Sequence, residues 1–309
     1  MPVQHISYPM DFKQLEYFTR VAELGSFTRA SHVLRVAQPA LSRQVRLLEQ
    51  ELQQPLLSRN GHGVTPNEAG LRLLEHARGI LHQFERARED MGRVQGTLAA
   101  RVMVGMSPSM ARVLSLPLTR EMRVHLPHAN LSINEGLSVS LREWLLAGRL
   151  DMALLYDAPA ASGLDVQPLH DEPLFLVSPR GRSEPAGGEV NLRTLAQWPL
   201  VLPGRPNALR MLLEAQLSLL GLKPMVGFEI DGYASMLDLV ADGAGHSVVP
   251  RHAIESVGGT ERFRVRAIVR PRLKRQLSLA SASGRVTTLT QQAVRELIVE
   301  LTGKLLPSR

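Results

Sequence analysis

The sequence contains a short segment whose side chains can read DNA: Gln38, Ser42, Arg43 and Arg46. Arginine and glutamine can form two hydrogen bonds with one base edge, whereas serine usually binds phosphate. At helical spacing the four side chains lie away from the apolar stripe of their helix, as on a recognition helix. From Leu24 to Leu48 there are four arginines and no acidic residue. The segment therefore predicts a DNA-reading helix, with a solvated helix face as the alternative.

Three short helices are expected to position these side chains. The first covers residues 11–24 and stops at Gly25, and Ser26 caps a second over residues 27–34. The third begins with Pro39 in its first turn, where the missing N–H has no cost. Helices joined by such tight turns predict a helix-turn-helix.

A small wing is expected after the third helix. Two glycines, Gly61 and Gly63, flank His62 and indicate a turn between two short strands. Arg59 and His62 can reach the DNA backbone or the minor groove from there. The alternative for each is simple exposure to water.

One long helix is expected from Asn67 to Val94, ending at residues 95–97. Its apolar residues recur at alternating steps of three and four, a heptad seam interrupted at Arg88. We expect this seam to pair with a second copy of the chain, with packing against its own domain as the alternative. The seam residues are Leu74, Ala77, Leu81, Phe84 and Met91.

From Arg101 onward the pattern changes to alternating strands and helices. This alternation predicts an α/β fold with a mostly parallel sheet. A loop rich in Pro, Gly and charge at residues 178–191 separates two similar runs. We therefore expect two lobes with a cleft between them.

Four loops of this half each follow a predicted strand and open a helix. Ligands of open α/β sheets bind at the carboxyl ends of strands, and helix N-termini favour anions. The polar side chains of these loops suit a small organic anion, although serine and asparagine there can also simply cap the helices. The candidate ligand-binding residues are Ser107, Ser109, Ser138, Ser140, Asn207, Asp231 and Tyr233.

Enzyme motifs are incomplete, so we expect no catalytic residue, no metal and no cofactor. Ser109 stands where a nucleophile elbow needs its second glycine. Pro127 breaks the helix that would align His125 with His128 for metal binding. A stretch without acidic residues runs from Arg262 to Arg295 and begins with alternating basic and apolar residues. This alternation predicts a half-buried strand with its charged face in water, with attraction of an anionic effector or of DNA as the alternative.

The length, charge and composition of the chain further limit the class of protein it can belong to. The 309 residues exceed one typical domain, carry a formal charge of +7 and include no cysteine. No apolar run reaches the roughly 18 residues of a membrane helix, and the N-terminus lacks the features of a secretory signal. We expect a cytoplasmic protein without a membrane partner, and the basic charge favours a polyanionic one.

The whole pattern resembles the LysR-type transcriptional regulators. The resemblance is carried by residues 26–49, by Thr65-Pro-Asn-Glu-Ala-Gly70 and, more loosely, by Leu146–Ala153 and Leu239–Gly245. Within the family the chain is similar to the nitrogen-assimilation-control branch. His62 departs from the pattern, because the family usually has arginine there.

The resemblance implies a winged helix-turn-helix, a linker-helix dimer that commonly becomes a tetramer, and a two-lobed effector domain like a periplasmic binding protein. The expected domains are 1–66 for DNA binding, 67–97 for the linker helix and 98–309 for the effector domain. Lobe I would comprise residues 98–169 and 271–309, and lobe II residues 170–270. The residues expected to contact DNA are Ser26, Arg29, Gln38, Pro39, Ser42, Arg43, Arg46, Arg59, His62 and Thr65.

The resulting expectation is a sequence-specific regulator that binds double-stranded promoter DNA and is modulated by an organic acid or nitrogen metabolite. A tetramer spanning two sites would bend the DNA between them. RNA polymerase is a candidate further partner. The alternative is a cytoplasmic small-molecule-binding module without specific DNA recognition.

Overall fold

The computed structural model describes residues 10–60, 63–92, 101–158, 163–180, 188–258, 260–285 and 287–306. The chain forms two compact units. One contains residues 1–97 and 147–149, and the other contains residues 98–146 and 150–309. Parts of the predictions above lie outside the described residues, namely residues 1–9, Gly61 and His62, residues 93–97 and residues 181–187.

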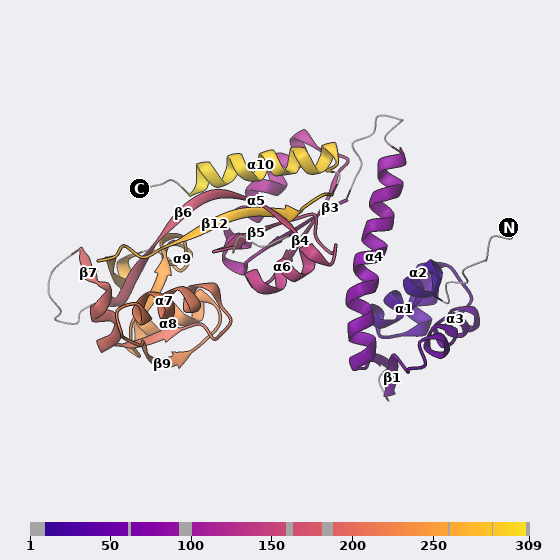
Figure 1. Cartoon of the computed structure of the whole chain (residues 1–309), viewed down its shortest axis with the longest axis horizontal. Helices are drawn as coiled ribbons and strands as arrows, with labels where there is room; N and C mark the ends of the chain where they lie inside the picture. Colours follow the sequence, from indigo (N-terminus) through magenta and orange to yellow (C-terminus); the bar gives the residue numbers. More distant parts are fainter. Residues whose placement is uncertain are drawn as a thin grey trace, which may run out of the picture. The chain divides into compact units, whose positions relative to one another are not determined.

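The first unit is a winged helix-turn-helix, and local signals set the limits of its helices (Figure 1). Asp11 and Gln14 form a reciprocal capping box at the first helix, which ends at Gly25 in the left-handed conformation (φ 63°). Ser26 then caps the second helix by accepting from the Arg29 amide at 3.3 Å. The three helices are α1 (Phe12–Leu24), α2 (Phe27–Leu34) and α3 (Gln38–Glu51).

The wing consists of two antiparallel strands, β1 (Leu57–Asn60) and β2 (Gly63–Pro66). It is held against the helices because the Val64 amide donates to the Gly25 carbonyl at 3.0 Å. A Cβ at Gly63 would lie 2.5 Å from that carbonyl oxygen, so only glycine fits there. The predicted wing is confirmed.

A single apolar core joins the helices of this unit. It contains Phe18 from α1, Leu41 and Leu48 from α3, and Leu74 from α4 (Glu68–Gly92). The predicted three-helix arrangement and the long helix are therefore confirmed within one or two residues at each end.

Helix α4 carries two kinds of apolar position. Leu74 and Ala77 are buried within the unit, so this half of the predicted seam packs against its own domain. Ile80 and Phe84 are each 45% exposed, and Leu71 is 53% exposed. Pairing of this helix with a second copy stays a prediction, in which Ile80 and Phe84 are the exposed apolar residues that follow Ala77.

Lobe I of the second unit is a sheet covered by helices on both faces. Alternate residues of β5 face opposite sides, so Met152 and Leu154 pack under α5 and α10, while Ala153 and Leu155 pack under α6. Its elements are β3 (Arg101–Met106), α5 (Pro108–His125), β4 (Asn130–Glu135), α6 (Ser138–Leu146), β5 (Met152–Tyr156) and α10 (Leu289–Leu305).

Lobe II has two apolar layers of its own. Leu209 and Leu213 of α7 lie in one layer, and Met236 and Val240 of α8 lie in the other. Its elements are β7 (Glu189–Asn191), a 3-10 turn at Leu192–Gln197, β8 (Pro199–Leu202), α7 (Ala208–Ser218), β9 (Met225–Glu229), α8 (Tyr233–Asp242), β10 (Ser247–Pro250), α9 (Arg251–Glu255), a 3-10 turn at Thr260–Arg262 and β11 (Phe263–Val269).

Two long strands, β6 (Leu164–Pro179) and β12 (Lys274–Ala282), run side by side and connect the lobes (Figure 1). Strand β12 pairs antiparallel with β5 and β6, and β6 continues into lobe II, where β10 and β11 pair antiparallel with it. Among the described strands, parallel pairs are β4–β3–β5, β7–β11 and β8–β9. The sheet is therefore mixed, and the expectation of a mostly parallel sheet was wrong because strands that cross twice between lobes must run in opposite directions.

One predicted surface is also corrected. Phe263 faces the core as expected, but Arg266 is only 3% exposed and does not face water. Its guanidinium carbon lies 4.8 Å from the centroid of the Trp198 ring, and it donates to Ser178 Oγ at 3.0 Å. A period-two pattern predicts a strand but not whether a second layer covers its polar face.

Candidate functional sites: a DNA-binding helix and a ligand cavity

Helix α3 presents its predicted DNA-reading side chains on the surface of the first unit. Gln38, Pro39, Arg43 and Arg46 are exposed, and Ser42 is half-buried. Because the opposite stripe of the helix is buried in the core, these side chains share the remaining face. The arrangement suits a helix that enters a DNA groove with its N-terminal half.

The electrostatics of this face favour a polyanion. Among the residues that the structure describes, Arg29, Arg43 and Arg46 form no ion pair. Ala37 gives α3 no side-chain cap, so the amides of its first turn can bind a phosphate.

The structure describes only some of the remaining residues that were predicted to contact DNA. Ser26 uses its hydroxyl as an acceptor to cap α2, which leaves the hydroxyl proton free to bind phosphate. Thr65 is exposed on β2. Arg59 belongs to β1, although its side chain is not among those described, and His62 lies outside the described residues.

The second unit contains a cavity of about 390 Å³ with walls from both lobes. Lobe I contributes the start of α5, the start of α6 and the end of β5. Lobe II contributes the loops that open α7 and α8, together with α9. Arg275, from the connecting strand β12, completes the wall. The cavity thus lies where the two lobes meet, at the ends of several strands.

Six of the seven predicted ligand-binding residues line this cavity, and Ser140 does not. The six are Ser107, Ser109, Ser138, Asn207, Asp231 and Tyr233.

Most of these six also support local structure. Ser107 accepts from the Met110 amide at 3.4 Å, and Ser138 accepts from the Tyr156 amide at 3.0 Å. Asn207 caps α7 through the Leu209 amide at 3.0 Å. A capping serine uses its oxygen as an acceptor, so its hydroxyl can still donate to a ligand, except that one of the Ser107 and Ser109 hydroxyls donates to the other at 3.1 Å. Capping and ligand binding are therefore compatible.

Sequence reasoning missed several residues of the cavity wall. These include Arg112, Tyr156, His252, Ser256 and Arg275. Arg275 belongs to the acid-free basic stretch, which was interpreted as a surface strand. No local pattern distinguishes an exposed arginine from one whose acid partner lies 103 residues away.

A buried ionic cluster forms one side of the cavity. Arg275 Nε donates to Glu172 Oε2 at 2.6 Å, and His252 Nδ1 lies 2.9 Å from Glu172 Oε1. Arg275 also donates to Tyr233 Oη at 3.1 Å, and its guanidinium carbon lies 3.5 Å from the centroid of the Tyr156 ring. The cluster thus joins β6, β12, α8 and α9 at the connection between the lobes.

Burial and charge act in opposite directions on this cluster. Burial would raise the pKa of Glu172, but Arg275 and His252 outweigh it and lower that pKa to about 2. Burial opposes the charge of Arg275, but the carboxylate of Glu172, which faces both Nε and Nη2 of the guanidinium, holds its pKa above the ordinary value. Burial raises the pKa of both tyrosines, which are therefore neutral.

The two lobes are also connected directly beside the cavity. Arg112 of α5 donates to the Ser256 carbonyl, at the end of α9, at 3.1 Å. Both residues line the cavity, so a ligand there would lie next to a contact between the lobes.

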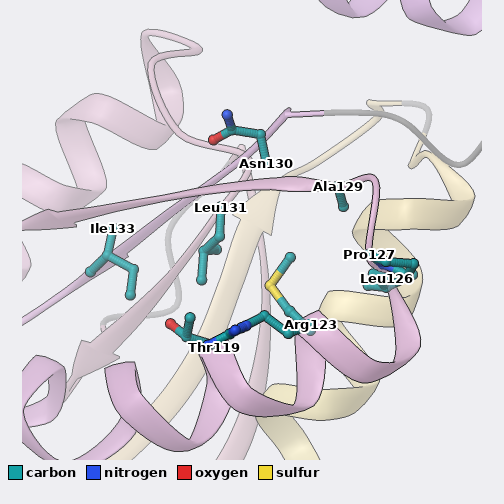
Figure 2. A pocket seen from close by; sticks show the side chains of 9 residues that line it. Thr119, Arg123, Leu126, Pro127, Ala129, Asn130, Leu131 and Ile133 are labelled. Carbon is teal, nitrogen blue, oxygen red and sulfur yellow. The ribbon is translucent and has the colours of Figure 1, made fainter.

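Figure 2 shows a different hollow of about 450 Å³, between the end of α5 and β4. Its walls are mostly apolar, and Leu131 and Ile133 of β4 face Thr119 and Arg123 of α5. It contains none of the predicted ligand-binding residues. The cavity between the lobes, with its convergent polar groups, is the better candidate ligand site.

The described residues contain neither a candidate membrane-spanning helix nor a candidate metal site. No helix among the described residues is long and apolar enough to cross a membrane. The same residues hold no group of three or more His, Cys, Asp or Glu placed to bind a metal.

The comparisons with known proteins give the class of the molecule. The model of the bacterial regulatory helix-turn-helix proteins of the lysR family matches residues 12–71, and the model of the LysR substrate-binding domain matches residues 95–303. The chain belongs to the LysR family and is a DNA-binding transcriptional regulator with an effector-binding domain.

Among its relatives is the nitrogen assimilation regulatory protein nac of Klebsiella aerogenes, which is 36% identical over 96% of each chain. The protein of the same name from Escherichia coli is also 36% identical, over 94% of this chain and 95% of the relative. The predicted likeness to the nitrogen-assimilation branch is therefore confirmed.

Solved structures share the fold over nearly the whole chain. CbnR, a LysR family regulator in complex with its target DNA, is 26% identical with a TM-score of 0.67, over 96% of this chain and 99% of that one. A full-length OxyR from Pseudomonas aeruginosa is 24% identical with a TM-score of 0.72, over 95% of both chains, and shows likeness of fold alone.

Proposed function

We propose that this regulator recognises a specific DNA sequence through α3 and that a small molecule bound between its lobes controls it. The observation that carries the first part is the exposed face of Gln38, Arg43 and Arg46, whose arginines have no described acid partner. Base edges supply the hydrogen-bond acceptors that such side chains match.

The second part rests on the cavity between the lobes. Its walls come from both lobes and include hydroxyl donors and Arg275, which is paired behind the wall with the buried Glu172. A ligand that contacts both lobes would favour their closed arrangement only by its difference in affinity for the two states. An organic acid or a nitrogen metabolite is the ligand class we favour, since two relatives are nitrogen assimilation regulators.

The proposal also includes an oligomeric state and a cellular compartment. We place the protein in the cytoplasm, where its DNA would be, as a dimer formed through α4 and commonly a tetramer spanning two sites. The tetramer would bend the intervening DNA, and RNA polymerase is a candidate partner at the promoter. We assign it no enzymatic activity, since its relatives are regulators.

The ligand assignment can be tested with a thermal-shift screen of the full-length protein against organic acids, aromatic acids and amino acids. A ligand at 100 times its dissociation constant stabilises the folded state by about 2.7 kcal/mol. The screen is then repeated with two serine variants. Ser109 lines the cavity, and its described side-chain partner is Ser107 Oγ at 3.1 Å, whereas Ser140 does not line the cavity.

We expect the ligand shift to be smaller in Ser109→Ala and unchanged in Ser140→Ala, with operator affinity equal in both without ligand. An equal loss in the two variants would contradict the assignment of this cavity. Ser138→Ala is less informative because it also removes the acceptor of the Tyr156 amide.

A further inference from the structure

Three side chains of the cavity wall have buried polar atoms without a hydrogen-bond partner among the described residues. Nη2 of Arg275 still forms an ion pair with Glu172 Oε2 at 2.5 Å, which leaves Nε2 of His252 and Oη of Tyr156. The His252 side chain is 10% exposed and Tyr156 is 4% exposed. Unpaired polar groups are costly in a protein interior, and those in native structures have a reason. Because both side chains line a cavity, a ligand is the partner that can satisfy them.

The charges next to His252 already balance one another. Glu172 of β6 faces Nδ1 of the ring, and Arg275 of β12 holds the same carboxylate. The arginine and the glutamate together contribute no net charge. Arg275 is therefore committed to an internal acid and is not free to neutralise an incoming anion.

The other titratable groups around the ring do not alter this balance. Tyr156 of β5 and Tyr233 of α8 are neutral, since burial raises the pKa of each. Arg112 of α5 and Asp231 before α8 also line the cavity, but both are exposed and have opposite charges. Nε2 of His252 is thus the ring nitrogen beside the buried cluster that has no described partner and can accept a proton and donate it to a ligand.

We propose that the ligand of this cavity carries one carboxylate on an apolar body, and that His252 takes up one proton when the ligand binds. Nδ1 of His252 faces Glu172, so the proton is gained at Nε2, which then donates to the carboxylate. The wall otherwise consists largely of apolar groups, such as Val113, Leu137 and Ala253. A carboxylate brought among them needs a compensating charge.

This inference rests on the proposed function, because it names the ligand of the same cavity, and it makes a thermodynamic prediction. A proton enters with the ligand, so affinity increases as pH falls. Where free His252 is neutral, affinity should decrease about tenfold for each unit of rising pH. A primary amide of the same shape brings no charge, so its affinity should be independent of pH.

The test is isothermal titration calorimetry of the full-length protein with benzoate, cyclohexanecarboxylate and hexanoate, each compared with its primary amide. Titrations between about pH 6 and 8 give the pH dependence. Titrations at one pH in phosphate and in Tris, which differ in ionisation enthalpy, count the protons taken up. We expect at least one acid to bind with uptake of one proton and its amide to bind with none.

Two histidine variants test whether the proton that is taken up with the ligand binds to His252. His252→Gln keeps a hydrogen-bonding side chain but cannot titrate, so the acid should bind more weakly and without proton uptake. The matched control is His125→Gln on α5, where the ring is exposed and paired with Glu121, and its titrations should match the wild type. The proton count in the wild type remains decisive even if His252→Gln fails to fold.

Several outcomes would overturn the inference. These are acids that bind without proton uptake, amides that bind as well as the acids at low pH, unchanged proton uptake in His252→Gln, or no binding by any of the acids. Failure of the proposed function has a different signature, because it would show as loss of specific operator binding by the wild type. A regulator that binds its operator and responds to an uncharged ligand would retain the function and contradict this inference alone.

Discussion

At the scale of single residues, the arginines of this protein occur in two different environments. Arg43 and Arg46 keep their charges exposed and without a described acid partner, ready for a polyanion. Arg275 instead has its charge buried, 3% exposed, against Glu172. In the proposed function the same residue type therefore recognises DNA in the first unit, whereas Arg275 is part of a buried ion pair in the second.

The first prediction concerns Arg43. Replacing it with alanine should cost roughly 1–3 kcal/mol of operator binding if its guanidinium bonds a base edge, and should relax specificity at that base pair. Fluorescence anisotropy with the operator and with single-base-pair variants measures both effects. Arg20→Ala is the control, since Arg20 lies on α1 and pairs with Glu23 at 3.6 Å. A uniform loss on every sequence would show that Arg43 binds phosphate.

The second prediction concerns Glu172, whose pKa in the folded protein is about 2, below its ordinary value of 4.5. A lowered folded pKa stabilises the protein above the unfolded pKa, and this stabilisation is lost as pH falls from about 4.5 towards 2. Glu172→Gln should therefore cost about 3–5 kcal/mol at neutral pH, because it leaves Arg275 buried without its acid.

Urea unfolding of wild type and Glu172→Gln between about pH 7 and pH 3 measures the difference in the free energy of unfolding. That difference should shrink as the pH falls below about 4.5. A difference that is constant over this range would mean that the carboxylate charge does not contribute, and that the variant loses packing alone.

At the scale of elements, helix α4 has the predicted apolar stripe, but the two parts of that stripe have different surroundings. The expected seam includes Leu74 and Ala77, which are buried in their own domain. Ile80 and Phe84 remain 45% exposed, and the Phe84 ring contacts the Phe12 ring at a tilt of 38°, with centroids 4.1 Å apart. The sequence predicts an apolar stripe but not which neighbour covers each part of it.

The third prediction tests pairing through the exposed part of α4. Ile80→Glu should weaken dimerisation at least tenfold, because a charge would have to be buried between the helices. Leu71→Glu is the control, since Leu71 is equally exposed but lies nine residues earlier, on the opposite face. Sedimentation equilibrium measures both dimer constants. Equal weakening by the two substitutions, or by neither, would contradict the proposed interface.

Sequence reasoning succeeded where signals are local and failed where they are not. Capping at Asp11, Ser26 and Gly25, and the loops that open α5 and α8, could be read because neighbours in the chain determine them. The ionic cluster of Glu172, His252 and Arg275 could not, since its members come from three distant segments. The mixed sheet was missed for the same reason, because β6 and β12 pair across more than one hundred residues.

At the scale of the whole molecule, the protein combines a unit that reads DNA with a two-lobed unit that contains a cavity. If binding of ligand and binding of operator are coupled, the coupling free energy must be the same in both directions. A ligand that strengthens operator binding tenfold must itself bind tenfold more tightly to the protein–DNA complex, which calorimetry with and without operator can check.

The measurement that tests the central claim most directly is selection of genomic fragments by the purified full-length protein, followed by footprinting of the enriched fragments. We predict a recurring, two-fold symmetric motif, protected by the wild type and lost in Arg43→Ala while Arg20→Ala keeps it. Binding should also weaken steeply with salt, since phosphate contacts release counterions. Fragments without a common motif, bound equally by wild type and Arg43→Ala, would contradict sequence-specific recognition and favour a ligand-binding module.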